Sequence, residues 1–337
     1  MRERLHGAVL HWWNQEDSGL GWDLLTLAAA PAEWGFRFGV EARSAAYDRG
    51  LLPARRGPVP VISVGNLSVG GTGKTPVAAH VMGLLEAQGR HPGLVARGYG
   101  EDELILHNRW HPGVPVVADP DRVRGVGRAV EEGADVVVLD DGFQHRRLAR
   151  DLDLVVVATE QGLPGRLLPR GPFREPRTAL ARADLVIVTR KSATAADAVA
   201  VEEEVRGGWP DLPVTRIRLA PAGWTDLAGG REGPPEGPVL AVCSIGRPDT
   251  FAALVEETLG RGADLMAFAD HHRFTEDDVA RIAGRVPEGG VLAVTEKDAV
   301  KLLPFDDSLP GARVLTLRVE IEAGAEPLIE AIRRAVA

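Results

Sequence analysis

The chain has 337 residues, of which 45% are hydrophobic and 26% charged, so it can bury ordinary cores and is not intrinsically disordered. Its length predicts about two domains. The net charge of -9 excludes a surface that attracts nucleic acid as a whole, and the one cysteine, Cys243, excludes an internal disulfide framework and fits a reducing compartment.

Residues 1–57 are predicted to form a helical segment rich in aromatic and basic side chains. The residues that give it this character are Trp12, Trp13, Trp22, Trp34, Phe36, Phe38, Arg37, Arg43, Arg49, Arg55 and Arg56. No small-residue cleavage site follows the start and no run of about 18 apolar residues occurs, so neither a signal peptide nor a membrane-spanning helix is predicted. The rings and arginines suit a helix at a lipid interface, and packing of the rings on the protein itself is the alternative.

Residues 58–204 alternate between strand-like runs and helix-like stretches. The runs are "VPVISV", "HPGLVAR", "VPVVA", "DVVVLD", "LDLVVVA" and "DLVIVTR", and the stretches between them include "TPVAAHVMGLLEAQG", "DRVRGVGRAVEEG" and "RTALARA". Continuous apolar runs are typical of strands covered on both faces, so a parallel sheet in an α/β domain is predicted. The helix after the last run is predicted to start at Ser192, a suitable N-cap.

Residues 205–238 are rich in glycine and proline around one alternating strand, "VTRIRLA", and are predicted to be a hinge or connector. In residues 239–337 the α/β pattern resumes with "VLAVCSI" and "GVLAVTEKDAVKLL" and closes on a helix, "AEPLIEAIRRAV". The predicted fold class is therefore α/β, with a parallel-sheet domain, a second, smaller α/β domain and an N-terminal helical segment.

A phosphate-binding loop is predicted at "SVGGTGKT", directly after "VPVISV". The stretch is similar to the P-loop pattern G-x-x-x-x-G-K-[ST], with Ser68 in place of the first glycine. In this pattern glycines let backbone N–H groups face an anion, Lys74 adds charge for the β- and γ-phosphates, and Thr75 offers a hydroxyl to Mg²⁺. A Gly-rich turn with an incidental lysine is the alternative, but the flanking strand and helix favour a P-loop NTPase-like domain. The predicted nucleotide-binding residues are Ser68, Val69, Gly70, Gly71, Thr72, Gly73, Lys74 and Thr75.

Asp140 and Asp141 end the apolar run in "ADVVVLDDGFQHRRL", where α/β sheets bind ligands. Alone such a pair is typical of a solvated turn, but behind a P-loop it matches the metal-holding role in phosphoryl transfer. The guanine-reading pattern N-K-x-D is absent, because "RKSA" follows "VIVT" and "TEKD" has the wrong spacing. Val69 stands where partition-type ATPases often carry a second lysine, so both observations argue against switch GTPases and partition ATPases.

Several further clusters are candidates for chemistry on an acceptor. They are Asp270, His271 and His272 in "FADHHRF", Arg170, Arg174 and Glu175 in "LPRGPFREP", Arg97 in "ARGYG", Glu101, Asp102 and Glu103 in "GEDELILHN", and Glu296, Lys297 and Asp298 in "TEKDAVKL". The first cluster can supply a general base, and a structural cap is its alternative. The second can present arginine to phosphate, and a surface loop with solvated charges is its alternative. The last two acidic clusters are by themselves more typical of helix starts.

These stretches occur in one order and together resemble the tetraacyldisaccharide 4'-kinase family. The resemblance runs from about residue 40 to residue 303 through "VISVGNLSVGGTGKTP", "ARGYG", "DDGFQHRRLARDLDLVVV", "LPRGPFREP", "VCSIGRPDTF", "FADHHRFT" and "VTEKDAVKL". It implies transfer of the γ-phosphate of ATP, with Mg²⁺, to the 4'-hydroxyl of an acylated glucosamine disaccharide 1-phosphate in lipid A synthesis. It also implies a P-loop domain, a hinge, a smaller domain, and a peripheral place on the cytoplasmic face of the inner membrane.

The resemblance also implies roles for individual residues. The metal-binding set is Thr75, Asp140 and Asp141, and the nucleotide-binding set adds Gln144 and His145 to residues 68–75. The catalytic set is Lys74, Arg174, Asp270, His271 and Asp102.

Asp102 is the candidate base because the family's aspartate lies in a "GDEP"-like stretch that here reads "GEDEL", and His271 would orient or polarise it. Two departures are present: the chain between "RGYG" and "EDE" is shorter than in the family, and Leu104 replaces the proline. These departures leave open a changed substrate range or a degenerate member with a structural or binding role. A separate alternative is a P-loop ATPase or nucleotide-binding module without a lipid acceptor. The oligomeric state does not follow from the sequence.

Overall fold

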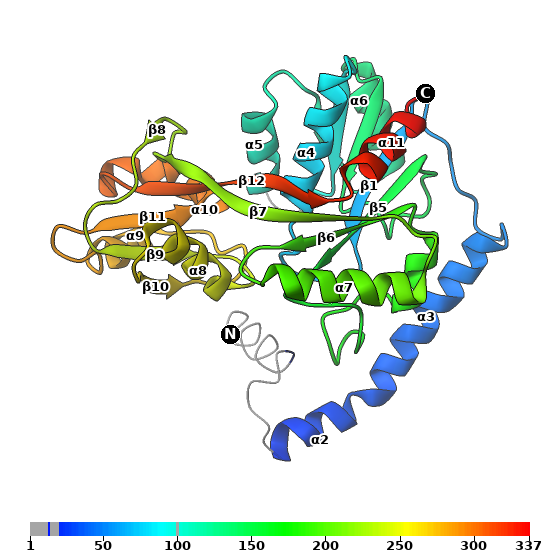
Figure 1. The fold of residues 1–337 in the computed structure, drawn as a ribbon, viewed down its shortest axis with the longest axis horizontal. Coiled ribbons are helices and arrows are strands. Elements are labelled where there is room, and N and C mark those ends of the chain that lie inside the picture. The colour runs from blue at the N-terminus through cyan, green and yellow to red at the C-terminus, as the bar shows by residue number, and fades with distance from the viewer. Residues whose placement is uncertain (1–12, 14–19, 99–100) are drawn as a thin grey trace.

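The computed structural model describes residues 13, 20–98 and 101–337, which form one mostly parallel sheet with helices on both faces (Figure 1), so the α/β prediction is confirmed. In spatial order the strands are β10 (Asp264–Ala267), β9 (Val239–Cys243), β11 (Val291–Thr295), β12 (Arg313–Ala323), β7 (Val214–Thr225), β6 (Leu185–Arg190), β5 (Leu152–Ala158), β1 (Val61–Asn66), β4 (Val136–Asp140), β2 (Pro92–Ala96) and β3 (Val116–Ala118). A short strand, β8 (Arg231–Glu232), pairs with β7.

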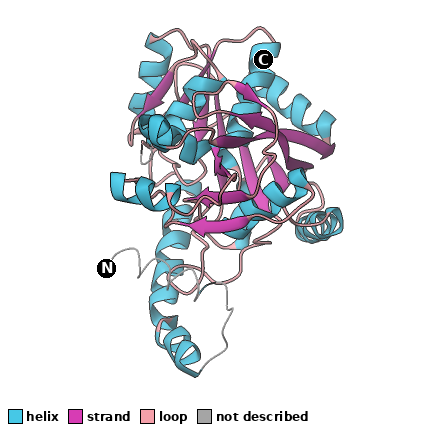
Figure 2. Cartoon of the chain, turned by 90° about the vertical axis from the view of Figure 1, so that its left-hand side faces the viewer, coloured by secondary structure: helices cyan, strands magenta, loops and turns pink. Residues whose placement is uncertain are grey.

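Two parallel arrays make up this sheet. The first array contains β3, β2, β4, β1, β5 and β6, and the second array contains β10, β9 and β11. The helices around them are α4 (Lys74–Ala87), α5 (Glu101–Trp110), α6 (Arg122–Glu131), α7 (Ala195–Gly208), α8 (Pro248–Leu259), α9 (Glu276–Ala283), α10 (Glu296–Leu302) and α11 (Ala325–Ala335), with 3₁₀ turns η1 (Arg177–Arg182) and η2 (Leu303–Ser308) (Figure 2).

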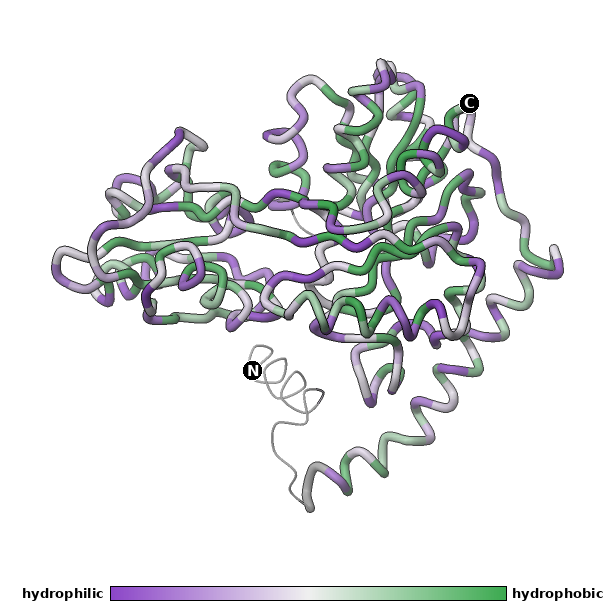
Figure 3. The backbone as a smooth tube through the Cα atoms, viewed as in Figure 1, coloured by the Kyte–Doolittle hydropathy of each residue, from purple (hydrophilic) through white to green (hydrophobic). Residues whose placement is uncertain are grey.

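The central strands are buried along their whole length because both faces of the sheet are covered. In β5, Leu154 and Val156 join the core under α4 and α11, whereas Val155 and Val157 join the core under α7. Figure 3 shows this interior as a hydrophobic centre. Covering on both faces accounts for the continuous apolar runs in the sequence.

An antiparallel pair, β7 and β12, joins the two arrays. β6 pairs with the first part of β7, from Val214 to Arg218, and β11 pairs with the first part of β12, from Arg313 to Leu315. Because β7 and β12 run in opposite directions, with Leu219 opposite Val319, the carboxyl ends of the two arrays face each other across the middle of this pair. The stretch predicted as a connector thus contains a long strand of the sheet.

The last helix, α11, packs on the first array although it follows the second in sequence. Leu328, Ala331 and Ile332 are buried in the same core as α4 and β1. Residues 325–335 therefore pack on the first array and not on the second. The division into segments 1–57, 58–204, 205–238 and 239–337 stays a prediction.

The start of α7 corrects one local prediction. The helix begins at Ala195 and not after Ser192, because Thr194 and Asp197 form a capping box: the Asp197 N–H donates to Thr194 Oγ1 at 3.1 Å, and the Thr194 N–H donates to Asp197 Oδ2 at 3.0 Å. A reciprocal pair satisfies two backbone donors, which a lone serine cannot do.

The N-terminal arm, helices α2 (Leu20–Ala28) and α3 (Ala30–Asp48), extends away from the sheet (Figures 1 and 2). One side of α3 is attached to the body: Arg170 Nη1 lies 2.8 Å from Glu33 Oε2, and Arg146 and Arg182 each donate to Ser44 Oγ at 3.0 Å. These contacts hold the arm against loops that follow β4 and β5.

The other side of the N-terminal arm is exposed and apolar. Trp34 is 70% exposed and Phe38 75%, one helical turn apart, and Leu24 and Leu27 of α2 are also exposed. None of the helices in the described ranges is long and apolar enough to cross a bilayer. Trp12 lies outside the described residues, as does the side chain of Trp22.

Replacing Ile332 by alanine should lower the free energy of unfolding by about 2–5 kcal/mol, because its fully buried side chain would leave a cavity between α11 and the first array. Chemical denaturation measures this value, and Arg333→Ala, an exposed change on the same helix, is the matched control. Equal stability of the two variants would contradict the packing of α11 in this core.

Candidate active site

A cavity of about 330 Å³ lies where the carboxyl ends of the two arrays face each other. Its floor is the middle of the β7–β12 pair, at Leu219, Leu315 and Leu317. The strand ends of the first array line the cavity with residues 70–76, 96–98, 140–141 and 191. The strand ends of the second array line it with residues 245–247, 270–271 and 295–297. Ligands of open α/β sheets bind at such edges, so this cavity is the candidate site.

The loop between β1 and α4 is shaped by glycines. Gly70 and Gly73 have φ angles of 101° and 90°, in the left-handed region that favours glycine. A Cβ on Gly73 would lie 2.6 Å from Leu219 Cδ1, so a side chain there would collide with the floor of the cavity. The loop can therefore present backbone N–H groups at the N-terminus of α4, which favours an anion.

Polar side chains hold this loop in place. Asn66 Nδ2 donates to Thr72 Oγ1 at 2.7 Å, and Thr189 Oγ1 donates to the Thr72 carbonyl at 2.9 Å. Lys191, at the end of β6, donates to the Gly71 carbonyl at 2.9 Å. The loop is thus supported by side chains from the strand before it and from β6.

Asp141 is the most strongly paired acid at the site. Arg174 donates to both carboxylate oxygens, at 2.9 and 2.6 Å, and Lys74 Nζ lies 3.6 Å from Oδ1. Burial alone would raise the pKa of Asp141, but Lys74 and Arg174 lower it overall, so the carboxylate is ionised. Burial lowers the pKa of Lys74, with Asp141 opposing that effect. Asp141 has a φ of 58°, a strained conformation of the kind that gathers at functional sites.

Asp140 and Thr75 complete a set of oxygen donors beside the loop. Asp140 is 4% exposed, and His107 Nε2 lies 3.3 Å from its Oδ2. No group of three or more His, Cys, Asp or Glu side chains suited to a metal occurs in the part of the chain that the structure describes. Mg²⁺ is usually held by only one or two carboxylates, with water and phosphate oxygens, so the residues present fit this ion.

Asp102 and His271 meet from opposite arrays. His271 Nδ1 lies 3.6 Å from Asp102 Oδ2, although His271 follows β10 and Asp102 lies in α5. Burial would raise the pKa of Asp102, but His271, Lys297 and Lys301 lower it to about 2. The close contact with Asp102 in turn raises the pKa of His271. His271 has a φ of 57°, and Asp270 Oδ1 lies 4.0 Å from its Nε2.

Some residues predicted for the nucleotide do not line the cavity. The first two loop residues form hydrogen bonds away from the cavity: Ser68 Oγ donates to Gln161 Oε1 at 2.6 Å, and the Val69 N–H donates to the Pro172 carbonyl. Gln144 Nε2 donates to the Asn66 carbonyl at 2.8 Å, which supports the end of β1.

His145 is likewise outside the cavity lining. Burial, helped by the charge of Arg122, lowers the pKa of His145 to about 4, so its ring is neutral near pH 7. Arg174 does not line the cavity either and reaches it through its contacts with Asp141 and Asn66.

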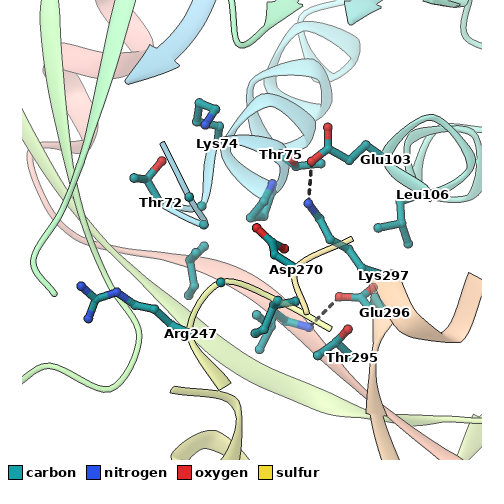
Figure 4. A pocket seen from close by; sticks show the side chains of 18 of the residues that line it. Thr72, Lys74, Thr75, Glu103, Leu106, Arg247, Asp270, Thr295, Glu296 and Lys297 are labelled. Atoms are coloured by element: carbon teal, nitrogen blue, oxygen red, sulfur yellow. Dashed lines mark hydrogen bonds and ion pairs between the residues drawn. The ribbon is translucent and has the colours of Figure 1, made fainter. Parts of the chain in front are cut away.

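The structure brings to the site one pair from the general candidate clusters and two residues that the sequence did not single out. Figure 4 shows Lys297 paired with Glu103, with Nζ 2.5 Å from Oε1, near Asp270 and the start of α4. Lys191 and Arg247 also line the cavity. Their signal in the sequence is only that each follows an apolar strand-like run, a feature shared by many solvated residues.

Comparison with known proteins gives consistent matches. The chain matches the family described as Tetraacyldisaccharide-1-P 4'-kinase over residues 25–104 and 100–337. A tetraacyldisaccharide 4'-kinase of Anaeromyxobacter dehalogenans (strain 2CP-C) is 39% identical, covering 97% of this chain and 95% of that protein. One of Syntrophus aciditrophicus (strain SB) is 35% identical over 87% and 89%. The crystal structure of LpxK from Aquifex aeolicus in complex with ATP is similar with a TM-score of 0.75 and 29% identity, covering 93% of this chain and all of that one.

Replacing Asp102 by asparagine should lower the pKa of His271 towards or below its ordinary value of 6.5, because the contact with the Asp102 carboxylate is the main cause that raises it. The raised pKa means that His271 contributes to folding fully below about pH 6.5 and loses that contribution as the pH rises through its folded pKa. NMR titration of the ring protons, assigned with His271→Gln, measures the shift. An unchanged titration in Asp102→Asn would mean that the two side chains do not interact in solution.

Proposed function

The chain belongs to the tetraacyldisaccharide-1-P 4'-kinase family, and on that premise we propose that the cavity between its two arrays is the active site. The protein is an ATP-dependent kinase of lipid A biosynthesis that acts at the 4' position of a tetraacylated disaccharide 1-phosphate. The observation that carries the proposed site is that the phosphate loop, the acid pair and His271 all line one cavity.

Nucleotide binding is proposed at the loop of residues 70–75. Lys74 would exchange its partner Asp141 for the β- and γ-phosphates, because a triphosphate carries more charge than one carboxylate. Thr75, Asp140 and Asp141 would hold Mg²⁺, which when bound neutralises charge on the triphosphate. Arg174 donates two hydrogen bonds to Asp141 and so positions this carboxylate from outside the cavity lining.

Asp102 is proposed as the base. The 4'-hydroxyl would donate its proton to the Asp102 carboxylate as its oxygen bonds to the γ-phosphorus, and ADP would leave with the electrons of the broken P–O bond. Asp102 is ionised at neutral pH, which such a step requires. His271 positions that carboxylate, and Asp270 faces the other nitrogen of the ring.

The N-terminal arm is proposed as the contact with the membrane, on its cytoplasmic face, because the acceptor is a lipid. Its exposed side chains Trp34, Phe38, Leu24 and Leu27 would enter the headgroup region. The loop that binds Glu33 through Arg170 also carries Arg174, so the arm and the acid pair are joined by one short stretch of chain.

Lys74→Ala should abolish labelled-phosphate transfer from ATP to the lipid disaccharide and leave the fold intact, because no other side chain is proposed to replace its charge at the phosphates.

Asp102→Ala should lower kcat by about 100-fold or more while the KM for ATP changes little, since a base acts only on the acceptor. Thin-layer analysis with and without Mg²⁺ measures both. ATP hydrolysis that is indifferent to the lipid would indicate a nucleotide-binding module, and full activity of Lys74→Ala would contradict the proposed site.

Changing Trp34 and Phe38 together to serine should weaken binding to vesicles of phosphatidylethanolamine and phosphatidylglycerol by about tenfold or more, because two large rings would no longer be buried in lipid. Flotation of the protein with the vesicles measures this, with Leu303→Ser, an exposed leucine on η2, as the matched control. Equal flotation of both variants would refute the arm as the membrane contact.

A further inference from the structure

The stretch "TEKDAVKL" lines the cavity at residues 295–297 but has no part yet in the proposed reaction, although its helix packs directly on the helix that carries Asp102. Three side chains of α10 reach α5: Glu296 accepts from Trp110 Nε1 at 3.0 Å, Lys297 pairs with Glu103, and Lys301 Nζ lies 3.9 Å from Asp102 Oδ2. Lys297 and Lys301 are one helical turn apart and so share this face of α10.

Lys301 is held in a fixed place by groups of the second array. Its Nζ lies 2.9 Å from Asp298 Oδ1 and donates to Ser244 Oγ at 2.5 Å, and its side chain is only 14% exposed. Asp298 is fully buried and also accepts from the Ser244 N–H at 2.9 Å and from Thr295 Oγ1 at 2.7 Å. A buried charge with this many partners has little freedom to move.

The same network reaches the histidine that faces Asp102. The His271 N–H donates to the Ser244 carbonyl at 3.2 Å, so Ser244 contacts both Lys301 and the backbone of His271. The His271 ring and the Lys301 ammonium approach one atom, Asp102 Oδ2, from the second array.

We infer that Lys301 is a positioning residue of this kinase, which together with Ser244 and Asp298 sets the orientation of Asp102 from the second array. The inference rests on the proposed role of Asp102 as base and goes beyond it, because it makes a productive base depend on contact between α10 and α5. Three charges face Asp102 from the second array, His271, Lys297 and Lys301, and among them Lys301 is anchored to the buried Asp298.

The test is a double-mutant cycle of Lys301→Met with Asp102→Asn in the full chain. Lys301→Met should lower kcat for labelled-phosphate transfer by about tenfold with the KM for ATP within about twofold, since a misplaced base affects the acceptor step and not nucleotide binding. In the Asp102→Asn background, where residual transfer is followed over long incubation, the same change should have no further effect. Lys301→Arg, which keeps the charge, should recover most of the activity, and Arg285→Met removes an exposed cation of the same array as control.

Equal losses from Lys301→Met in both backgrounds would show a structural role only and overturn the inference, as would unchanged kcat in the single variant. Full activity of Asp102→Asn would instead overturn the base assignment itself, so the two failures are distinguishable. Where the thermal transition shows that Lys301→Met does not fold, Ser244→Ala removes one of the two partners that hold Lys301 and keeps its charge. A smaller loss that again vanishes in Asp102→Asn supports the inference, and an equal loss in both backgrounds overturns it.

Discussion

The antiparallel pairing of β7 with β12 is the constraint on which the site depends. Without it the two arrays would be separate parallel sheets, each with ligand-binding loops at its own carboxyl edge. Because the pair places Leu219 opposite Val319 and continues into β6 on one side and β11 on the other, these edges face one cavity. One array contributes the phosphate loop and the acid pair, and the other contributes His271 and α10.

Charge is distributed over the two edges in a complementary way. On the first array, Asp141 is ionised and shared between Lys74 and Arg174. Asp102 of α5, also on the first array, is ionised because His271, Lys297 and Lys301 face it from the second array. Asp141 and His271 both have φ near +57°, so each array has one residue with a strained backbone in the proposed active site. Contact between the arrays therefore completes the site electrostatically.

Local chemistry was predictable from the sequence, whereas contacts between distant segments were not. The strands follow from the apolar runs and are confirmed. The loop around Lys74 and the acids at the end of β4 follow from the spacing of the P-loop, and they line one cavity, while their roles stay a prediction. The start of α7 was misplaced because Ser192 and Thr194 are both good caps and only Asp197 distinguishes them. The pairing of His271 with Asp102 was predicted from the family resemblance alone. No local sequence pattern indicates that the residues after β10 lie beside α5. The role of Lys301 could not be predicted, because its spacing is that of any helix face.

The most direct test of a site assembled between the arrays is a crystal structure with a non-hydrolysable ATP analogue and Mg²⁺. The account predicts the triphosphate on residues 70–75, Lys74 transferred from Asp141 to the phosphates, and the metal beside Thr75 and the acid pair, with His271 and Lys301 still facing Asp102. A nucleotide bound outside this cavity, or an Asp141 that keeps Lys74 while the metal binds elsewhere, would contradict it.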